Sequence, residues 1–275
     1  MSITRFASIT ALTLALTAAL STTVFGTHSW GNYHWARTSN PFTLTVLNST
    51  TPDWDVYVAD ILPRWGSGAI IKLYEDYSSD SSKVRRQCNA PTGQIRICNL
   101  AYGQTGWLGI AGISVDVYGH ITRGYTKLND TYFSQSFYNT DAWKKSVTCQ
   151  ELGHDFGLDH QDEDFNNTPL YTCMDYQVPP YPYPNQHDWD MLALIYGHTD
   201  SYNSYVTAGA GSSSGGDGSG VCNAPPGKGC NKATVGEDIV PHGWGISLGR
   251  RGNQETFEHV HPDGSREVTH VTWVR

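Results

Sequence analysis

Hydrophobic and polar positions alternate along the first part of the chain in the manner of strands. In "FTLTVLN", Phe42, Leu44 and Val46 fall on one side of an extended segment. The short apolar runs "AIIKLY" and "QIRIC" predict a second and a third strand. Residues 107–128 predict two more strands, joined by a turn at 118–120.

Helical spacing of apolar residues appears in three other segments. Residues 51–65 predict an amphipathic helix that Pro63 should end or kink. A second helix should begin at Thr140 or Asp141 and stop at Gly157, and "HDWDMLALIYG" predicts a third. Strands followed by a helix, more strands and two helices predict a layered α/β or α+β domain over residues 27–200.

The composition changes sharply after this domain. Residues 201–221 include "AGAGSSSGGDGSG", which is typical of a flexible linker. Residues 222–275 predict a small β-rich module, because two β-prone runs flank a turn at 262–264. A hairpin of this size needs a disulfide or docking on the main domain to be stable.

The N-terminal residues 1–26 predict a signal peptide, with one Arg, an apolar Ala/Leu/Thr-rich run and small residues at the end. We therefore expect a secreted protein. Six cysteines in an exported chain indicate disulfides, and six cysteines allow 15 connectivities. Local spacing favours pairing of Cys88 with Cys98 and of Cys222 with Cys230, which leaves Cys149 for Cys173.

Composition and charge narrow the possible partners. With 39% hydrophobic and 16% charged residues, the 275-residue chain can bury a substantial core. The formal net charge of −8 argues against nucleic acid or an anionic membrane as a partner. We expect a monomer.

The stretch "QELGHDFGLDH" carries the candidate chemistry. On a helix, residues 150 and 154 point the same way, and Glu151 lies about 100° round from residue 150. Gly157 lets the backbone turn out of the helix, so that His160 can return to a metal ion shared with His154. By chance, the pattern E-x-x-H-x-x-G-x-x-H would arise in roughly one such chain in a thousand, so we favour a metal site over two structural histidines.

This stretch resembles the zinc motif of the metzincin metallopeptidases, most closely that of the matrixins. "TCMDY" is similar to their Met-turn, with Met174 beneath the metal and Tyr176 two residues on. The resemblance implies a twisted, mostly parallel sheet with a covering helix, an active-site helix and a C-terminal helix. It also implies that extended substrate lies along a strand containing Leu108, Gly109, Ile110 and Ala111.

One departure from the motif is the glutamine at position 150, where the family has its first zinc-binding histidine. Three interpretations follow. In the first, Gln150, His154 and His160 together bind Zn2+; in the second, another histidine supplies the missing nitrogen; in the third, the metal is lost. The candidates for such a histidine are His120, His259, His261 and His270.

The resemblance implies a secreted zinc-dependent metalloendopeptidase. In it, Glu151 is the general base and Tyr176 stabilises the tetrahedral oxyanion. The alternative to an enzyme that acts on a peptide or protein substrate is a catalytically inactive secreted binding protein that has the same fold and has lost the metal. His28 and His34 lie among aromatic residues, for which aromatic packing is the default interpretation.

Overall fold

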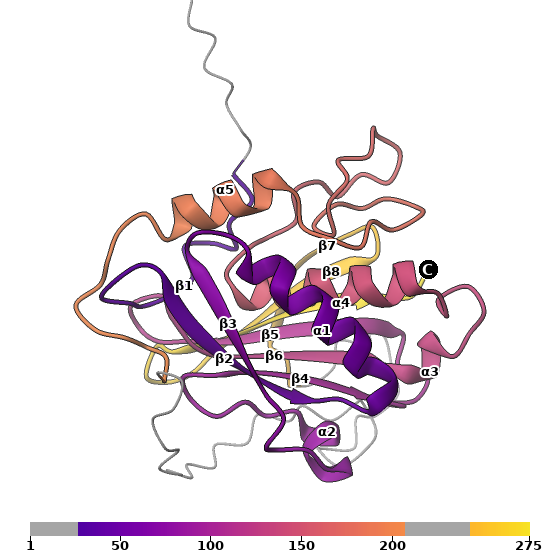
Figure 1. The fold of residues 1–275 in the computed structure, drawn as a ribbon, viewed down its shortest axis with the longest axis horizontal. Helices are drawn as coiled ribbons and strands as arrows, with labels where there is room; N and C mark the ends of the chain where they lie inside the picture. The colour runs from indigo at the N-terminus through magenta and orange to yellow at the C-terminus, as the bar shows by residue number, and fades with distance from the viewer. Residues whose placement is uncertain (1–26, 207–242) are drawn as a thin grey trace, which may run out of the picture.

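The computed structural model describes residues 27–206 and 243–275. The predicted signal peptide, the pair Cys222 and Cys230, and most of the predicted linker lie outside these residues. Within the described ranges the chain has a mixed α/β fold built on one large sheet, with helices packed against it (Figure 1). No helix in these ranges is long and apolar enough to cross a membrane.

The strands of the sheet follow the order β3-β2-β4-β6-β5-β9-β8-β7, and β1 pairs with β6 outside this path. The bounds are β1 His34–Trp35, β2 Phe42–Ser49, β3 Ile71–Asp76, β4 Ile95–Leu100, β5 Trp107–Val115, β6 His120–Asn129, β7 Ile246–Arg251, β8 Gln254–Val260 and β9 Arg266–Trp273. The pairs β2–β3, β2–β4, β4–β6 and β1–β6 are parallel, whereas the pairs from β6 through β5 to β7 are antiparallel. The mixed α/β class and the parallel part of the sheet are as predicted.

The two long helices are α1 (Pro52–Gly66) and α4 (Asp141–Asp155), which pack against each other and against the sheet (Figure 1). Pro63 does not end α1, which continues to Gly66. Because Pro63 lies in the last turn, it removes only one backbone donor close to the helix end. At the start of α4, the Thr140 hydroxyl accepts a hydrogen bond from the Trp143 N–H at 3.2 Å, so Thr140 is the N-cap.

Three shorter helices complete the described part. They are α2 (Ser82–Gln87), α3 (Asp130–Phe133) and α5 (Gln186–Ile195). Helix α5 corresponds to the predicted last helix and begins with a capping box between Asn185 and Asp188. The sequence pattern predicted neither α2 nor α3, both of which are only one or two turns long.

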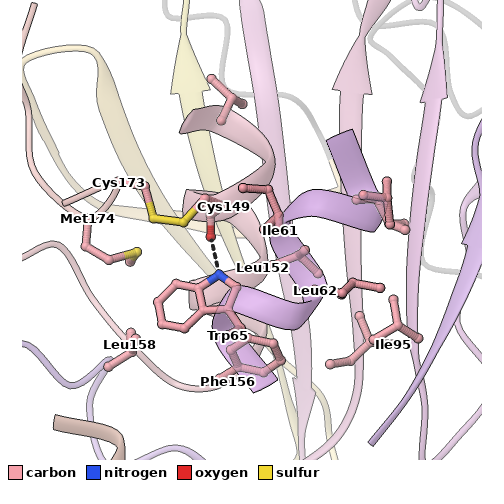
Figure 2. Close-up of a cluster of buried hydrophobic side chains, with 14 of the residues drawn as sticks. Ile61, Leu62, Trp65, Ile95, Cys149, Leu152, Phe156, Leu158, Cys173 and Met174 are labelled. Carbon is pink, nitrogen blue, oxygen red and sulfur yellow. Dashed lines mark hydrogen bonds between the residues drawn. A yellow bond between two sulfur atoms is a disulfide. The ribbon is translucent and has the colours of Figure 1, made fainter. Parts of the chain in front are cut away.

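The main core fixes the position of α4. The Trp65 indole N–H of α1 donates to the Cys149 carbonyl of α4 at 3.0 Å, and Met174 lies buried nearby (Figure 2). A disulfide joins Cys149 to Cys173, and a second joins Cys88 to Cys98, which confirms both predicted pairings. The first bond ties α4 to the segment that carries Met174.

The C-terminal strands continue the main sheet. Strand β9 pairs antiparallel with β5 along its length, from Trp107 opposite Trp273 to Val115 opposite Arg266. A second buried cluster contains Trp244 and Phe257 from the C-terminal segment together with Ile110 of β5. The described C-terminal residues are thus docked on the rest of the protein, which meets the requirement that the sequence set for a hairpin of this size.

Candidate metal centre

The last two turns of α4 carry most of the predicted site. Gln150, Glu151 and His154 are all buried there. The chain then turns sharply at Gly157, whose φ is +92° and where a Cβ atom would lie 2.3 Å from the Tyr33 carbonyl oxygen. A residue with a side chain fits this corner poorly, and the turn directs His160 back toward His154.

Three imidazoles meet at this point. His154 Nε2 lies 3.2 Å from His160 Nε2, and His270 Nε2 lies 3.2 Å from the same atom. His270 comes from β9, far along the chain from the other two. All three side chains are buried, and they form a group that could hold a metal ion.

The outer nitrogen of each imidazole has a hydrogen-bond partner. His154 Nδ1 lies 2.8 Å from the Leu158 carbonyl oxygen, so this nitrogen must carry the proton and Nε2 keeps its lone pair. His160 Nδ1 lies 3.0 Å from the Tyr176 hydroxyl, and His270 Nδ1 lies 3.2 Å from the Thr256 hydroxyl. Partners of this kind fix the tautomer and the ring orientation of metal-binding histidines.

The spacing of the three nitrogens fits a zinc ion. Tetrahedral zinc with Zn–N bonds of about 2.0–2.1 Å separates its ligand nitrogens by about 3.3–3.4 Å. Burial lowers the pKa of His154 to about 4 and holds the pKa of both His160 and His270 well below the usual value. The imidazoles are therefore neutral at pH 7, which is the state that binds metal.

Gln150 is turned toward the C-terminal strands. Its side-chain oxygen accepts a hydrogen bond from the Gln254 amide at 3.3 Å and lies 3.4 Å from the Thr272 hydroxyl. Gln150 therefore has partners from β8 and β9 in this arrangement, and the third imidazole of the cluster belongs to His270.

Glu151 lies fully buried between α4 and β5. One carboxylate oxygen accepts a hydrogen bond from the Thr272 hydroxyl at 2.6 Å, and a Cβ atom at Gly109 would lie 2.5 Å from the same oxygen. Only a glycine in β5 lets the carboxylate come this close. Burial raises the pKa of Glu151 to about 8, although hydrogen bonds from Thr272 and from the Ala111 backbone act in the opposite direction.

Met174 and Tyr176 lie on the other side of the imidazoles. A Cβ atom at Gly153 would lie 2.6 Å from Met174 Sδ, so the methionine packs directly against the inner turn of α4. Tyr176 is buried, and its hydroxyl contacts His160 Nδ1. In this arrangement Tyr176 orients His160, and its predicted role at the oxyanion stays a prediction.

The predicted substrate strand has a partner on both sides. Leu108, Gly109, Ile110 and Ala111 lie in β5, between β6 and β9. An extended peptide can pair with this side of β5 only after β9 has left it. The proposed substrate role of these four residues stays a prediction with that condition.

A pocket of about 250 Å³ lies against the His270 side of the imidazole cluster. His270, Trp30, Gln254, Asp159 and Glu163 contribute to its wall. Trp30 packs edge-on against the rings of His154 and His270, with ring centroids 5.6 and 5.9 Å apart. A solvent-filled route therefore leads to the His270 side of the cluster.

Comparison with known proteins adds little. No protein-family model matches the sequence, and no curated protein is similar to it. The crystal structure of archaemetzincin from Archaeoglobus fulgidus, in complex with malonate, has a TM-score of 0.33 and 14% sequence identity. The match covers 55% of this chain and 99% of that chain. A likeness of this extent identifies neither a family nor an activity, so the functional conclusion depends on the side chains.

Proposed function

We propose that this protein is a secreted zinc-dependent metallopeptidase whose metal centre consists of His154, His160 and His270. The observation that carries the proposal is the convergence of three buried Nε2 atoms, with the His160 atom 3.2 Å from each of the other two, at the end of the helix that also carries buried Glu151. The signal peptide predicted over residues 1–26 and the two disulfides support export to an oxidising compartment.

Each residue has a distinct part in this proposal. The three imidazoles would hold the metal, and the Leu158 carbonyl, Tyr176 and Thr256 keep their rings in place. A zinc ion bound there supplies Lewis-acid polarisation of a peptide carbonyl and of water. Because burial raises the pKa of Glu151 to about 8, it would accept the proton of the attacking water near or above that pH, or at lower pH once the positive charge of a bound metal lowers the pKa. Thr272 and the β5 backbone hold its carboxylate in position.

A specific observation favours a second candidate function. Strand β9 covers β5, and the Thr272 hydroxyl occupies one oxygen of Glu151. A protein fixed in this arrangement would hold zinc without cleaving extended peptides, and would act as a secreted binding protein. Hydrolysis assays separate the two functions.

The test of the metal centre compares single variants of the full chain. We expect His270→Gln to weaken zinc binding at least about 10- to 100-fold, because even outer-shell changes cost that much. Gln150→Ala should keep the metal, and His259→Gln serves as the control in the same hairpin. Zinc is measured by elemental analysis after dialysis against a chelator. Zinc loss in Gln150→Ala but not in His270→Gln would restore Gln150 as the ligand.

The test of catalysis uses quenched fluorescent peptides of mixed sequence. We expect cleavage by the zinc-loaded protein, its loss on chelation and its return with added zinc. Glu151→Gln should retain zinc and lose cleavage. A zinc-loaded protein that cleaves none of the peptides, or Glu151→Gln with full activity, would contradict the peptidase and favour the binding protein.

A further inference from the structure

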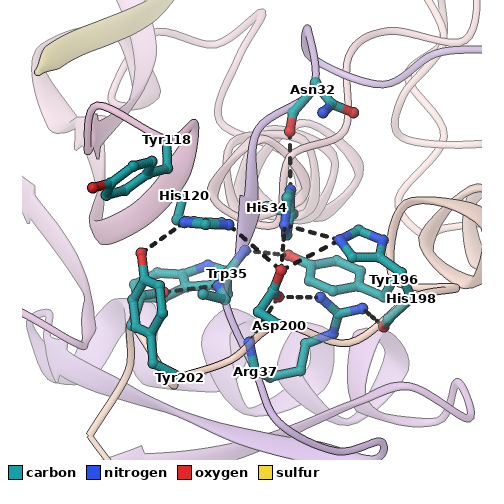
Figure 3. Close-up of polar contacts among 12 residues, drawn as sticks. Asn32, His34, Trp35, Arg37, Tyr118, His120, Tyr196, His198, Asp200 and Tyr202 are labelled. Atoms are coloured by element: carbon teal, nitrogen blue, oxygen red, sulfur yellow. Dashed lines mark hydrogen bonds and ion pairs between the residues drawn. The ribbon is translucent and has the colours of Figure 1, made fainter. Parts of the chain in front are cut away.

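A second group of metal-binding side chains lies outside the centre described above. His34 comes from β1, His120 from the start of β6, and His198 and Asp200 from the segment after α5 (Figure 3). The Asp200 Oδ1 atom lies 3.6 Å from His34 Nε2, 3.5 Å from His120 Nε2 and 3.5 Å from His198 Nε2. Three segments that are distant in the sequence thus bring three imidazole nitrogens to one carboxylate oxygen.

The other nitrogens of His34 and His120 have partners that fix the rings. His34 Nδ1 lies 2.9 Å from the Asn32 carbonyl oxygen, so it carries the proton. His120 Nδ1 lies 2.6 Å from the Tyr202 hydroxyl, which donates its own proton to Asp116 at 2.6 Å. The phenol oxygen must therefore accept from His120 Nδ1–H. Both Nε2 lone pairs then face Asp200.

The second oxygen of Asp200 is used elsewhere. Asp200 Oδ2 accepts hydrogen bonds from the Arg37 guanidinium at 2.9 Å and from the Arg37 backbone N–H at 3.0 Å. The Arg37 guanidinium, an ion-pair partner at 2.9 Å, favours the charged form of the Asp200 carboxylate. The carboxylate is ionised, and Oδ1 remains for the histidines.

The cluster needs a positive charge at its centre. Lone pairs of neutral His34 and His120 repel an ionised carboxylate oxygen at these distances, and His34 Nε2 also lies 3.2 Å from His198 Nε2. Tetrahedral zinc with bonds of about 2.0–2.2 Å separates its ligand atoms by about 3.3–3.6 Å. The four separations given above, 3.2 to 3.6 Å, lie within or just below this range.

We propose that His34, His120, His198 and Asp200 form a second zinc site with a structural role. The ligand atoms of His34, His120 and Asp200 all lie within 4.8 Å of one another, and His198, which contacts His34 and Asp200, would turn toward His120 to complete a tetrahedral sphere with no position for a substrate. The site joins the N-terminal segment, the turn before β6 and the segment after α5. The His198 side chain is 52% exposed, so the metal can enter from solution. The proposal is independent of the peptidase activity.

Metal counting on the full chain tests the site. We expect two equivalents of zinc in the parent protein and about one in His198→Gln, in His120→Gln and in His160→Gln. His261→Gln lies outside both groups and is the control, with two equivalents expected. One equivalent in the parent that disappears in His160→Gln, or two equivalents in both His198→Gln and His120→Gln, would overturn the second site.

Thermal stability provides a readout that does not depend on activity. His160→Gln leaves only the second site intact, so added zinc should raise its Tm. The double variant His160→Gln/His198→Gln should show no such rise, and its Tm in chelator should match that of His160→Gln. Because His198 is half exposed, its replacement leaves the core packing unchanged. Equal zinc-induced shifts in the single and double variants would contradict the proposal.

Discussion

Lys127 offers a quantitative test of how this sheet buries a charge. It lies in β6 opposite Ile110 of β5 and Cys98 of β4, and only 2% of its surface is exposed. Its ammonium group lies 5.7 and 5.6 Å from the ring centroids of Tyr102 and Tyr125. Burial raises the pKa of both phenols, so both rings are uncharged at neutral pH.

Burial lowers the pKa of Lys127 from 10.5 to about 7. The unfolded chain binds this proton up to about pH 10.5, whereas the folded chain binds it only up to about pH 7. Between these values the unfolded state holds more protons, so the free energy of unfolding rises with pH. At about 1.36 kcal/mol per pKa unit, the buried charge destabilises the folded state by about 5 kcal/mol. This destabilisation is complete below pH 7 and disappears above pH 10.5.

The test is Lys127→Met, which keeps the length of the side chain and removes the charge. We expect the variant to be more stable than the parent by at least about 2 kcal/mol at pH 6, with a difference that shrinks toward pH 10. Urea unfolding in chelator, followed by tryptophan fluorescence from pH 6 to 10, measures this. Lys83→Met on the exposed surface of α2 is the control. A variant that matches the parent at every pH would refute the reasoning.

Three further substitutions test the geometry around the first metal centre. Gly157→Ala should lower the free energy of unfolding by at least about 2 kcal/mol and weaken zinc binding, because it combines positive φ with a Cβ contact at 2.3 Å. The control Gly119→Ala, with φ of +90° and open space around the Cβ atom, should lower it by about 1 kcal/mol. Equal losses in denaturant titrations would contradict this. Replacing Cys149 and Cys173 by alanine should cost about 3–4 kcal/mol, since the bond closes a loop with a sequence separation of 24; an unchanged denaturation midpoint would refute it. Gly109→Ala should displace the Glu151 carboxylate and lower peptide cleavage more than zinc content, and an unchanged kcat would exclude that contact.

Local patterns in the sequence were sufficient to predict the helix that carries the site. The Thr140 cap, the buried face of α4 and the Gly157 corner each depend on residues within a few positions of one another. The Cys88–Cys98 disulfide was predictable from its short spacing, and the Cys149–Cys173 disulfide was predicted as the pair that remained. The sequence overestimated the effect of Pro63, since a proline in the last turn leaves little helix to break.

His270 was among several candidates for the missing ligand, and local pattern could not choose between them. Its position depends on β9 pairing with β5, a contact between distant segments that no periodicity encodes. One signal was present in "VTHVTW", residues 268–273, which contains no Asp, Glu, Lys or Arg. A run of this kind is typical of a strand covered on both faces, and a histidine within it needs a buried partner.

His34 shows the same limit more clearly. Its aromatic neighbours in the sequence favoured simple packing, and it does contact the rings of Tyr196 and His198. Its polar partners come from residues 120, 198 and 200, which only the folded chain brings together.

The position of His270 on β9 couples zinc binding to the docking of the C-terminal strands. A metal ion held by His154, His160 and His270 binds the docked arrangement more tightly than an undocked one. Each tenfold difference in metal affinity between the two arrangements makes the free energy of docking more favourable by about 1.4 kcal/mol. By the same linkage, a peptide that replaced β9 along β5 would remove an imidazole from the metal. It would also release Gln150 from Gln254, whose amide donates a hydrogen bond to the Gln150 side-chain oxygen in the docked state. Gln150 would then be the side chain on α4 left to take the vacated position, which reconciles a glutamine in the motif with a third imidazole from β9.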